Sequence, residues 1–253
     1  GDVVEKITSV NNELVKQTVK LQQKKFRELE NKFLLEGFKS ISEAHDCGIK
    51  IEYVFVQEDK TDIYNFVNDK IIPTTQDVLK KISTTESAPD AVAVGVQKRY
   101  KFSDIKNVER ALLLENIKDA GNLGTILRTS AAFGADMVVL YGNSVDLYNP
   151  KVVRSSVGCL WKVPVIIVKD FDELKNYFGN FTRIATLPRA ANFLANFKVQ
   201  TPFLVMFGSE ADGLSSELID FATDEVKIEM EKNVESLNLS ISCAVVLYKL
   251  LMY

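Results

Sequence analysis

Short apolar runs alternate with more polar segments through the first hundred residues of the chain. The runs predict strands and the segments between them predict helices. The predicted strands lie at 33–36, 51–56 and 91–96, and the predicted helices lie at 39–46, 62–68 and 76–82. Thr75 precedes the last of these helices and is a suitable N-cap. Alternating β and α units in so short a stretch predict a small three-layer α/β sandwich.

The rest of the chain repeats the alternation with more strongly apolar runs. Predicted strands lie at 111–114, 137–140, 182–186, 203–207 and 226–230. A continuous apolar run such as 203–207 is typical of a strand that is buried on both faces of a parallel sheet. From Asn238 onward the chain is apolar on most sides, which predicts a long buried helix capped by Ser236 or Asn238.

A polar and charged segment separates these two halves. We therefore expect a first domain at 1–98, a linker at 99–107 and a second domain at 108–253, all of the α/β class. No apolar run is long enough to cross a membrane. The three cysteines are scattered and the chain has one histidine, so we expect no metal site, no disulfide framework and a reducing, cytoplasmic location.

A basic stretch near the start of the chain bears on possible partners. Residues 14–27 contain five basic residues and no acid. In one continuous helix, Lys16, Lys20 and Lys24 would recur every four residues, and Arg27 would continue their stripe. Such a stripe can follow a phosphate backbone, although a solvated helix face fits the same pattern. Because the formal net charge is −3, phosphate contacts would depend on local clusters of this kind.

The segment after the apolar run 203–207 carries candidate chemistry. Gly208 lets the backbone turn sharply at the strand end. Glu210 places a carboxylate where open α/β sheets bind their ligands. Ser215 is a suitable cap for a short helix at 216–221. An ordinary strand, turn and helix with a charged loop would give the same pattern.

A second candidate segment follows the run at 111–114. Asn122 lies near the start of a predicted helix, Arg128 points away from its apolar face, and Gly134 ends it. A dinucleotide-binding enzyme is the competing interpretation. The glycines in this segment do not form G-x-G-x-x-G, and no acid follows the second strand in the expected place. Both observations weaken the dinucleotide-binding interpretation.

Three phrases occur in order along the second half of the chain. They are N-x-G-x-x-x-R-x-x-x-x-F-G at 122–134, F-G-S-E-x-x-G-L-S at 207–215, and I-x-M at 228–230 followed by S-L-N-x-S at 236–240. Together they resemble the three motifs of the SpoU (TrmH-like) family of the SPOUT superfamily, whose members are S-adenosylmethionine-dependent RNA ribose 2'-O-methyltransferases. The first hundred residues resemble the L30e-like substrate-binding domain of some relatives.

This resemblance implies a fold and a set of partners. The fold would be a knotted (trefoil), Rossmann-like parallel sheet domain, preceded by a small L30e-like sandwich. The cofactor would be S-adenosylmethionine, and the substrate would be RNA, with 23S ribosomal RNA expected and transfer RNA left open. The protein would work as a homodimer with its site at the interface, without a metal and away from membranes.

The resemblance also assigns roles to individual residues. Substrate orientation and chemistry would fall to Asn122, Arg128, Glu210, Ser236 and Asn238. The methyl donor would be held by Thr186, Leu187, Gly208, Ile228, Met230 and Leu237. RNA would be contacted by Lys16, Lys20, Lys24, Arg27, Lys151 and Arg154. We therefore expect the loops that carry the catalytic residues to converge at one edge of the sheet.

Two features leave alternatives open. Glu229 stands where the family usually has proline, so the donor loop loses a fixed φ and gains a charge. This departure and the acidic net charge favour a second hypothesis, an RNA-binding or ribosome-assembly module with a degenerate donor site.

The family's motif-one arginine, here Arg128, is often assigned as a base. Arginine hardly deprotonates, so its chemistry favours a grip on phosphate.

Overall fold

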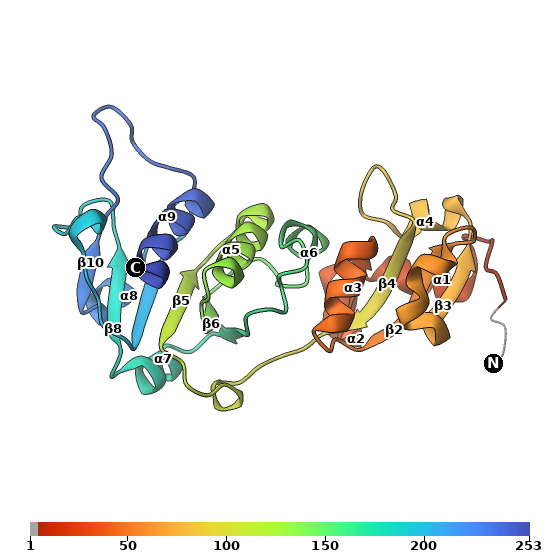
Figure 1. Cartoon of the computed structure of the whole chain (residues 1–253), viewed down its shortest axis with the longest axis horizontal. Coiled ribbons are helices and arrows are strands. Elements are labelled where there is room, and N and C mark those ends of the chain that lie inside the picture. Colours follow the sequence, from red (N-terminus) through yellow and green to blue (C-terminus); the bar gives the residue numbers. More distant parts are fainter. Residues whose placement is uncertain (1–4) are drawn as a thin grey trace. The chain divides into compact units, whose positions relative to one another are not determined.

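The computed structural model describes residues 5–253 and divides into two compact units (Figure 1). The first comprises the described residues through Lys98 together with Asp146–Trp161. The second comprises Arg99–Val145 and Lys162–Tyr253. The segment 146–161, which the expected boundaries place in the second domain, therefore packs in the first unit.

The first unit is a mixed four-stranded sheet with helices on both faces. Its strands are β1 (Lys32–Glu36), β2 (Ile51–Gln57), β3 (Ile71–Thr74) and β4 (Ala91–Val96), in the order β1-β4-β2-β3. Its helices are α1 (Glu13–Lys20), α2 (Lys24–Glu30), α3 (Phe38–Asp46), the 3₁₀ helix η1 (Thr61–Lys70), α4 (Gln76–Ile82) and α6 (Pro150–Ser155). The predicted small α/β sandwich is confirmed, and Thr75 caps α4 as expected.

The two faces of this sheet are covered by different segments. Val15 of α1 and Val78 of α4 share a core cluster with Leu34 of β1. Its neighbour Phe33 points to the opposite face, because side chains alternate along a strand. There the ring of Phe33 lies 4.5 Å from that of Tyr148, in the segment that packs into this unit from the second half of the chain.

The prediction of one continuous basic helix is wrong. The chain leaves α1 after Lys20 and re-enters a helix at Lys24. Arg27 explains the break, because its Nη1 donates to the carbonyl oxygens of Leu21 and Gln22 at 3.1 and 3.0 Å. In an unbroken helix those two carbonyls would accept backbone N–H groups instead. Arg27 is 2% exposed, so its side chain does not lie on any surface stripe.

Arg27 also anchors the inserted segment. Its Nε and Nη2 lie 3.0 and 2.9 Å from the same oxygen of Asp146. Further along, Nη1 of Arg154 lies 3.3 Å from Glu36 and also donates to the hydroxyl of Thr84. Two charge-assisted contacts therefore hold residues 146–161 against the first sheet.

The second unit is built on a six-stranded sheet that is parallel throughout. Its strands are β5 (Arg110–Glu115), β6 (Met137–Tyr141), β7 (Val165–Val168), β8 (Thr182–Thr186), β9 (Phe203–Phe207) and β10 (Asp224–Val226). Their order is β10-β8-β9-β5-β6-β7. The run 203–207 is a fully buried central strand, as predicted.

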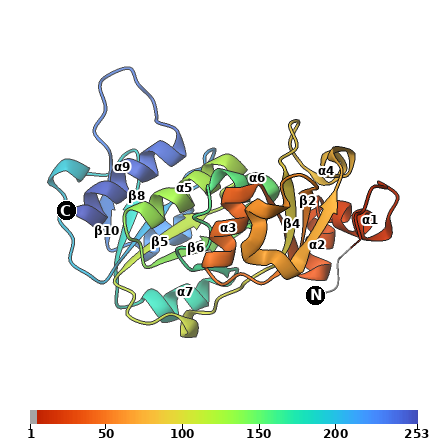
Figure 2. The ribbon, with the colours of Figure 1, turned by 45° about the vertical axis from the view of Figure 1, so that its right-hand side comes forward.

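The strand predicted at 226–230 is misplaced, since β10 ends at Val226. Lys227 instead pairs with the loop that follows β8. Its N–H donates to the Asn192 carbonyl at 3.0 Å, and its own carbonyl accepts from Leu194 at 2.8 Å. Beyond that point the chain forms a long loop that projects from the sheet before the last helix (Figures 1 and 2).

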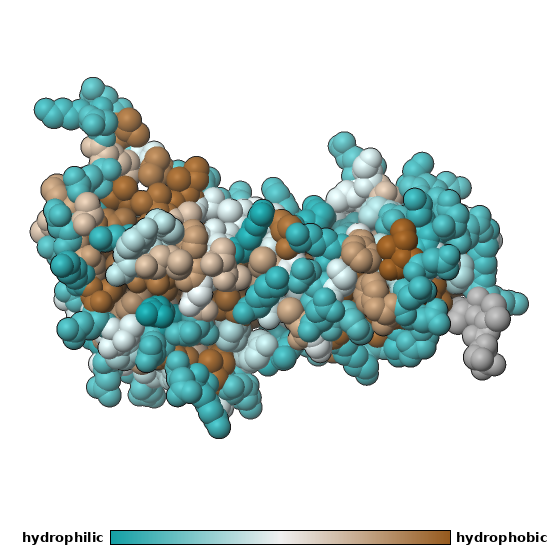
Figure 3. Space-filling model, in the orientation of Figure 1, coloured by the Kyte–Doolittle hydropathy of each residue, from teal (hydrophilic) through white to brown (hydrophobic). Residues whose placement is uncertain are grey.

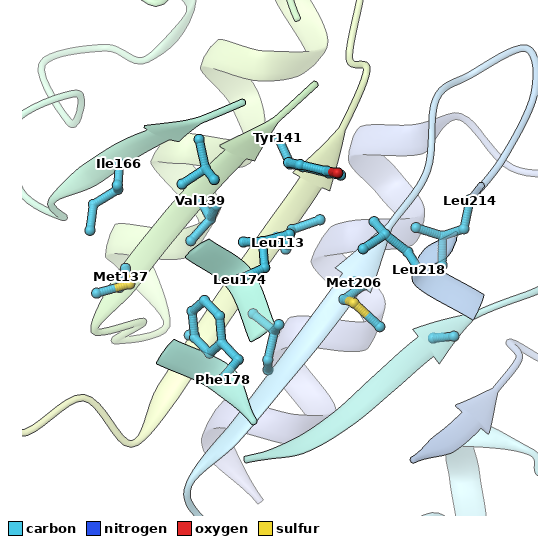
Figure 4. Packing of buried hydrophobic residues seen from close by; sticks show 14 residues of the cluster. Leu113, Met137, Val139, Tyr141, Ile166, Leu174, Phe178, Met206, Leu214 and Leu218 are labelled. Carbon is cyan, nitrogen blue, oxygen red and sulfur yellow. The ribbon is translucent and has the colours of Figure 1, made fainter. Parts of the chain in front are cut away.

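Helices cover both faces of this second sheet. On one face, Leu174 and Phe178 of α7 (Phe171–Phe178) and Leu218 of α8 (Ser216–Phe221) pack on β5, β6 and β9 (Figure 4). On the other face, α5 (Ala120–Ala132) and α9 (Leu239–Met252) lie side by side (Figures 1 and 2). All the strands run the same way, so their carboxyl ends meet at one edge.

The helix ends show how the local sequence positions that edge. Asn238 caps α9, since its Oδ1 accepts from the N–H groups of Ser240 and Ile241 at 2.9 and 3.3 Å. Ser215 caps α8 through a 3.3 Å bond from the Leu218 N–H. These caps confirm two of the predicted helix starts. Within residues 5–253, no helix combines the length and apolarity that a bilayer crossing requires.

Candidate functional site

Two adjacent pockets lie at the carboxyl edge of the second unit's sheet. The first has a volume of about 580 Å³ and lies at the ends of β8, β9 and β10, below the loop that leads to α9. The second has a volume of about 1040 Å³ and lies at the loops after β5, β6 and β9. They share the wall formed by Ser209, Ser236, Leu237, Leu239 and Ser242.

The first pocket gathers all the residues predicted to hold a methyl donor. They are Thr186, Leu187, Gly208, Ile228, Met230 and Leu237. Backbone groups fix the loops that carry them. The hydroxyl of Thr186 donates to the Met206 carbonyl at 2.8 Å, and the N–H of Leu187 donates to the Val226 carbonyl at 3.0 Å. The pocket wall is therefore built from strand ends that are bonded to one another.

Gly208 allows a close approach between two backbone segments at this edge. A Cβ at this position would lie 1.9 Å from the carbonyl carbon of Gly213 and 2.0 Å from the nitrogen of Leu214. Both are backbone atoms, so no side-chain rotation could relieve the overlap. The 208–214 loop folds back on itself only because position 208 has no side chain.

The loop over the first pocket is open to solvent. Met230 and Leu237 line the pocket, yet both are exposed, as is Val234 between them. Glu229, which stands in place of the family's proline, is also an exposed lining residue. Its charge therefore lies in water at the pocket rim and carries no burial penalty.

Most of the residues that line the second pocket are polar, and Glu210 is one of them. The carboxylate accepts from the backbone N–H groups of Lys118 and Asp119 at 3.4 and 3.3 Å and from Nδ2 of Asn122 at 3.3 Å. These donors belong to the start of α5, where the helix dipole favours a negative charge. Asn238 lines the same pocket. The loops of the three sequence motifs therefore converge as predicted.

The sequence did not single out several groups in this pocket. Asn116 has a φ of 54°, and its Oδ1 accepts from the Asn143 N–H at 2.7 Å. The ammonium of Lys118 donates to the carbonyl of Asn143. These contacts join the loop after β5 to the loop after β6. Their only sequence signal is the polar stretch between the predicted strand and Asn122.

Arg128 and Ser236 are placed differently. Ser236 lines both pockets. Arg128 lies on the exposed side of α5 and lines neither of them. Within one chain, the structure thus brings together four of the five predicted catalytic residues and leaves the arginine apart.

The residues predicted to contact RNA also divide into two groups. Lys16, Lys20, Lys24 and Lys151 are exposed. Arg27 is buried in its contact with Asp146, so its assignment to an RNA-facing stripe is wrong. Arg154 is half-buried and its guanidinium already contacts Glu36 and Thr84.

Titratable groups beside the pockets are held protonated or are used structurally. Tyr141 donates to Glu217 at 2.6 Å, and burial together with this bond raises its pKa. Burial raises the pKa of the Cys243 thiol, and the charge of Glu210 raises it further. Glu115 is 3% exposed and accepts from the N–H and hydroxyl of Ser215 at 2.7 and 2.6 Å. Neither Tyr141 nor Cys243 is therefore available as a base near neutral pH.

Metal ligands do not cluster in the described part of the chain. Residues 5–253 contain no group of three or more histidine, cysteine, aspartate or glutamate side chains arranged to hold an ion.

Family models match both parts of the chain. Residues 109–248 match the model described as the SpoU rRNA Methylase family. Residues 12–93 match the model described as an MRM3-like substrate binding domain. The two matched ranges leave residues 94–108 between them.

Individual proteins are similar over nearly the full length. An uncharacterized tRNA/rRNA methyltransferase of Synechocystis is 33% identical, with 96% of this chain and 92% of that protein covered. The 23S rRNA (guanosine(2553)-2'-O)-methyltransferase RlmP of Bacillus subtilis is 29% identical, with 98% and 99% covered. The crystal structure of an AdoMet-bound rRNA methyltransferase from Sinorhizobium meliloti has a TM-score of 0.89 at 26% identity, with 98% and 97% covered.

Proposed function

The chain belongs to the SpoU rRNA methylase family, and we propose that it transfers a methyl group from S-adenosylmethionine to a ribose 2'-hydroxyl of ribosomal RNA. The observation that carries this proposal is the pair of adjoining pockets at one sheet edge. One is lined by all six residues expected at the donor, and the other by the polar groups expected at the ribose. The similarity to RlmP and to an AdoMet-bound rRNA methyltransferase supports it.

The residues of the first pocket fit the donor. A volume of about 580 Å³ suits a ligand of this size. Gly208 lets the backbone approach a ligand closely, as argued from the space around its missing Cβ. When bound, the donor supplies an electrophilic methyl group on a sulfonium. Leu187, Ile228 and Leu237 would hold it chiefly through backbone groups.

The residues of the second pocket would orient the ribose. Glu210, held by the start of α5, fixes Asn122, and Ser236 and Asn238 lie across the same pocket. Such positioning converts the transfer into an effectively intramolecular step. Because Tyr141 and Cys243 stay protonated, neither takes the hydroxyl proton. Arg128 would grip a phosphate, since its guanidinium remains a cation.

The substrate is proposed to be 23S ribosomal RNA rather than transfer RNA. The support comes from the first unit, which matches an MRM3-like substrate binding domain, and from RlmP. Exposed Lys16, Lys20, Lys24 and Lys151 would contact its phosphates. RlmP is a bacterial protein, and we place the reaction of this chain in the cytoplasm.

We further propose a homodimer formed through α9. Ile241, Val245, Tyr248 and Met252 recur at helical spacing and are 40 to 54% exposed. They form an apolar stripe on a helix whose opposite side is already buried by Leu247 and Leu250, and Figure 3 shows apolar residues gathered over this helix. A stripe of this kind on an otherwise packed helix suits a second copy of the same helix, since a two-fold axis places like residues against like.

If α9 forms the dimer interface, charged side chains placed in this stripe should weaken self-association. Glutamate at both Val245 and Tyr248 is expected to weaken self-association by about 100-fold, because the interface would bury unpaired charges. Sedimentation velocity at several concentrations measures it. Asn176→Glu, at an exposed position of α7, adds one such charge elsewhere in the unit and should leave the dimer intact. A double variant that remains dimeric would place the interface on another surface.

The family's knotted path is also part of the proposal. Asn192 of the loop after β8 donates to Glu225 in β10, and Leu194 donates to Lys227 just beyond it, which closes a ring of chain at 186–227. The last helix contacts η3 (Leu194–Asn196) in this ring. These contacts support a C-terminal segment that passes through the ring, an exception to the usual unknotted chain.

Two measurements test the proposed activity. Titration of the full chain with S-adenosylmethionine should release or absorb heat at a single site, and a tritiated donor should label an rRNA fragment at a ribose 2'-oxygen. RNA binding without any donor heat would instead support the assembly module with a degenerate donor site. The exposed position of Glu229 favours an intact donor site, because its charge is solvated.

A further inference from the structure

A corner of the first unit gathers lysines from three helices. The turn between α1 and α2 packs against the end of α4, where Nε2 of Gln22 donates to the carbonyls of Lys81 and Ile82 at 3.0 and 2.7 Å. The exposed lysines of these elements are Lys16, Lys20, Lys24, Lys25, Lys80 and Lys81. Most of them therefore meet at the two sides of one turn.

The acids on the same helices lie away from this turn or are already paired. Glu13 begins α1 and Asp77 lies in the first turn of α4, each at the end opposite to the turn between α1 and α2. Glu28 lies 3.6 Å from Lys24, and Glu30 ends α2. The corner thus carries a local excess of positive charge on a chain whose net charge is −3. Such a patch suits a polyanion.

One aromatic ring lies among these lysines. Phe26 is half-buried, while its neighbour Arg27 makes the buried contacts of this turn. The ammonium groups of Lys20 and Lys25 lie 5.4 and 5.1 Å from the centre of the Phe26 ring. The ring is therefore partly exposed beneath the ammonium groups of two flexible lysines, in contrast to the core rings of this unit.

We propose that Phe26 stacks an unpaired base of the RNA substrate, while Lys20 and Lys25 bind the phosphates beside it. The proposal rests on the proposed function and specifies which part of the RNA binds at this corner of the first unit. Paired bases present no free face, so a stacking ring selects a single-stranded segment. A protein partner fits less well, because lysine is depleted at the centres of protein interfaces.

Direct binding to RNA tests the proposal without methyl transfer. The full chain, free of donor, is titrated against a fluorescent unpaired rRNA oligonucleotide and against the same sequence in a duplex. Phe26→Ala should weaken binding of the unpaired RNA about 10-fold, the loss of one stacked base, and leave the duplex within about twofold. Phe26→Trp keeps a ring and should restore affinity. Lys20→Gln and Lys25→Gln should each reduce the salt slope by about 0.7.

Two matched variants control for nonspecific effects. Phe38→Ala removes a ring that is 47% exposed on α3 of the same unit, and Lys60→Gln removes an exposed charge before η1. Both should leave RNA affinity unchanged, and thermal melting checks that each variant folds. The stacking role is overturned if Phe26→Ala binds unpaired RNA like the wild type, or loses duplex binding equally. A wild-type chain that binds no RNA would instead contradict the proposed function itself.

Discussion

Replacing Gly208 by alanine is expected to weaken donor binding at least 100-fold while the two units stay folded. The added Cβ would lie 1.9 Å from the carbonyl carbon of Gly213 and 2.0 Å from the nitrogen of Leu214. Backbone atoms cannot rotate away, so the whole 208–214 loop must shift. Returning the shifted loop to the conformation that binds the donor would cost about 3 kcal/mol, the size of an overpacking penalty. A cost of this size corresponds to the 100-fold loss of affinity. Calorimetry with S-adenosylmethionine measures it.

Gly213→Ala is the matched control for this loss. Gly213 lies in the same loop with a φ of 66°, but a Cβ there would meet no atom within 4 Å. Its cost should be limited to the left-handed backbone, about 1 kcal/mol. Donor affinity should therefore fall much less than in Gly208→Ala. Equal losses in the two variants would show that loop strain, rather than the close approach at Gly208, controls the pocket.

Part of the pocket proposed for the donor was accessible from sequence for a physical reason. Thr186 ends the apolar run 182–186 and Gly208 follows the run 203–207, and parallel strands bring their carboxyl ends to one edge. The donor role of these residues and of Ile228 came from the resemblance to the family's motifs, because periodicity alone predicted a strand at 228. The order β10-β8-β9-β5-β6-β7 was not accessible, because it depends on which strands pair across long connections.

Other features depend on contacts between distant residues. Local periodicity favoured a continuous helix through Arg27, but the guanidinium instead takes the Leu21 and Gln22 carbonyls and meets Asp146, 119 residues away. No local rule identifies such a partner. Likewise the apolar character of 226–230 predicted a strand, whereas Lys227 bonds to the loop after β8. In both places a tertiary contact overrides local propensity.

Arg128→Ala is expected to lower methylation of an rRNA fragment by roughly 100-fold, because the loss of its grip on a phosphate lets the ribose hydroxyl shift out of line with the methyl group. Donor affinity should stay within about twofold, because Arg128 lines neither pocket of its own chain. Single-turnover transfer and donor calorimetry separate the two quantities. Full activity in this variant would remove Arg128 from the chemistry.

The isolation of Arg128 within one chain makes a stronger test possible. If a dimer through α9 brings Arg128 of one copy to the pockets of the other, a mixed dimer of Arg128→Ala and Gly208→Ala holds one intact site. An equimolar mixture should then recover about a quarter of wild-type activity, because half the dimers are mixed and each has one working site of two. Differently tagged chains, co-expressed and purified through both tags, isolate the mixed dimer. If Arg128 serves its own chain, both sites of that dimer carry a defect, and no activity returns.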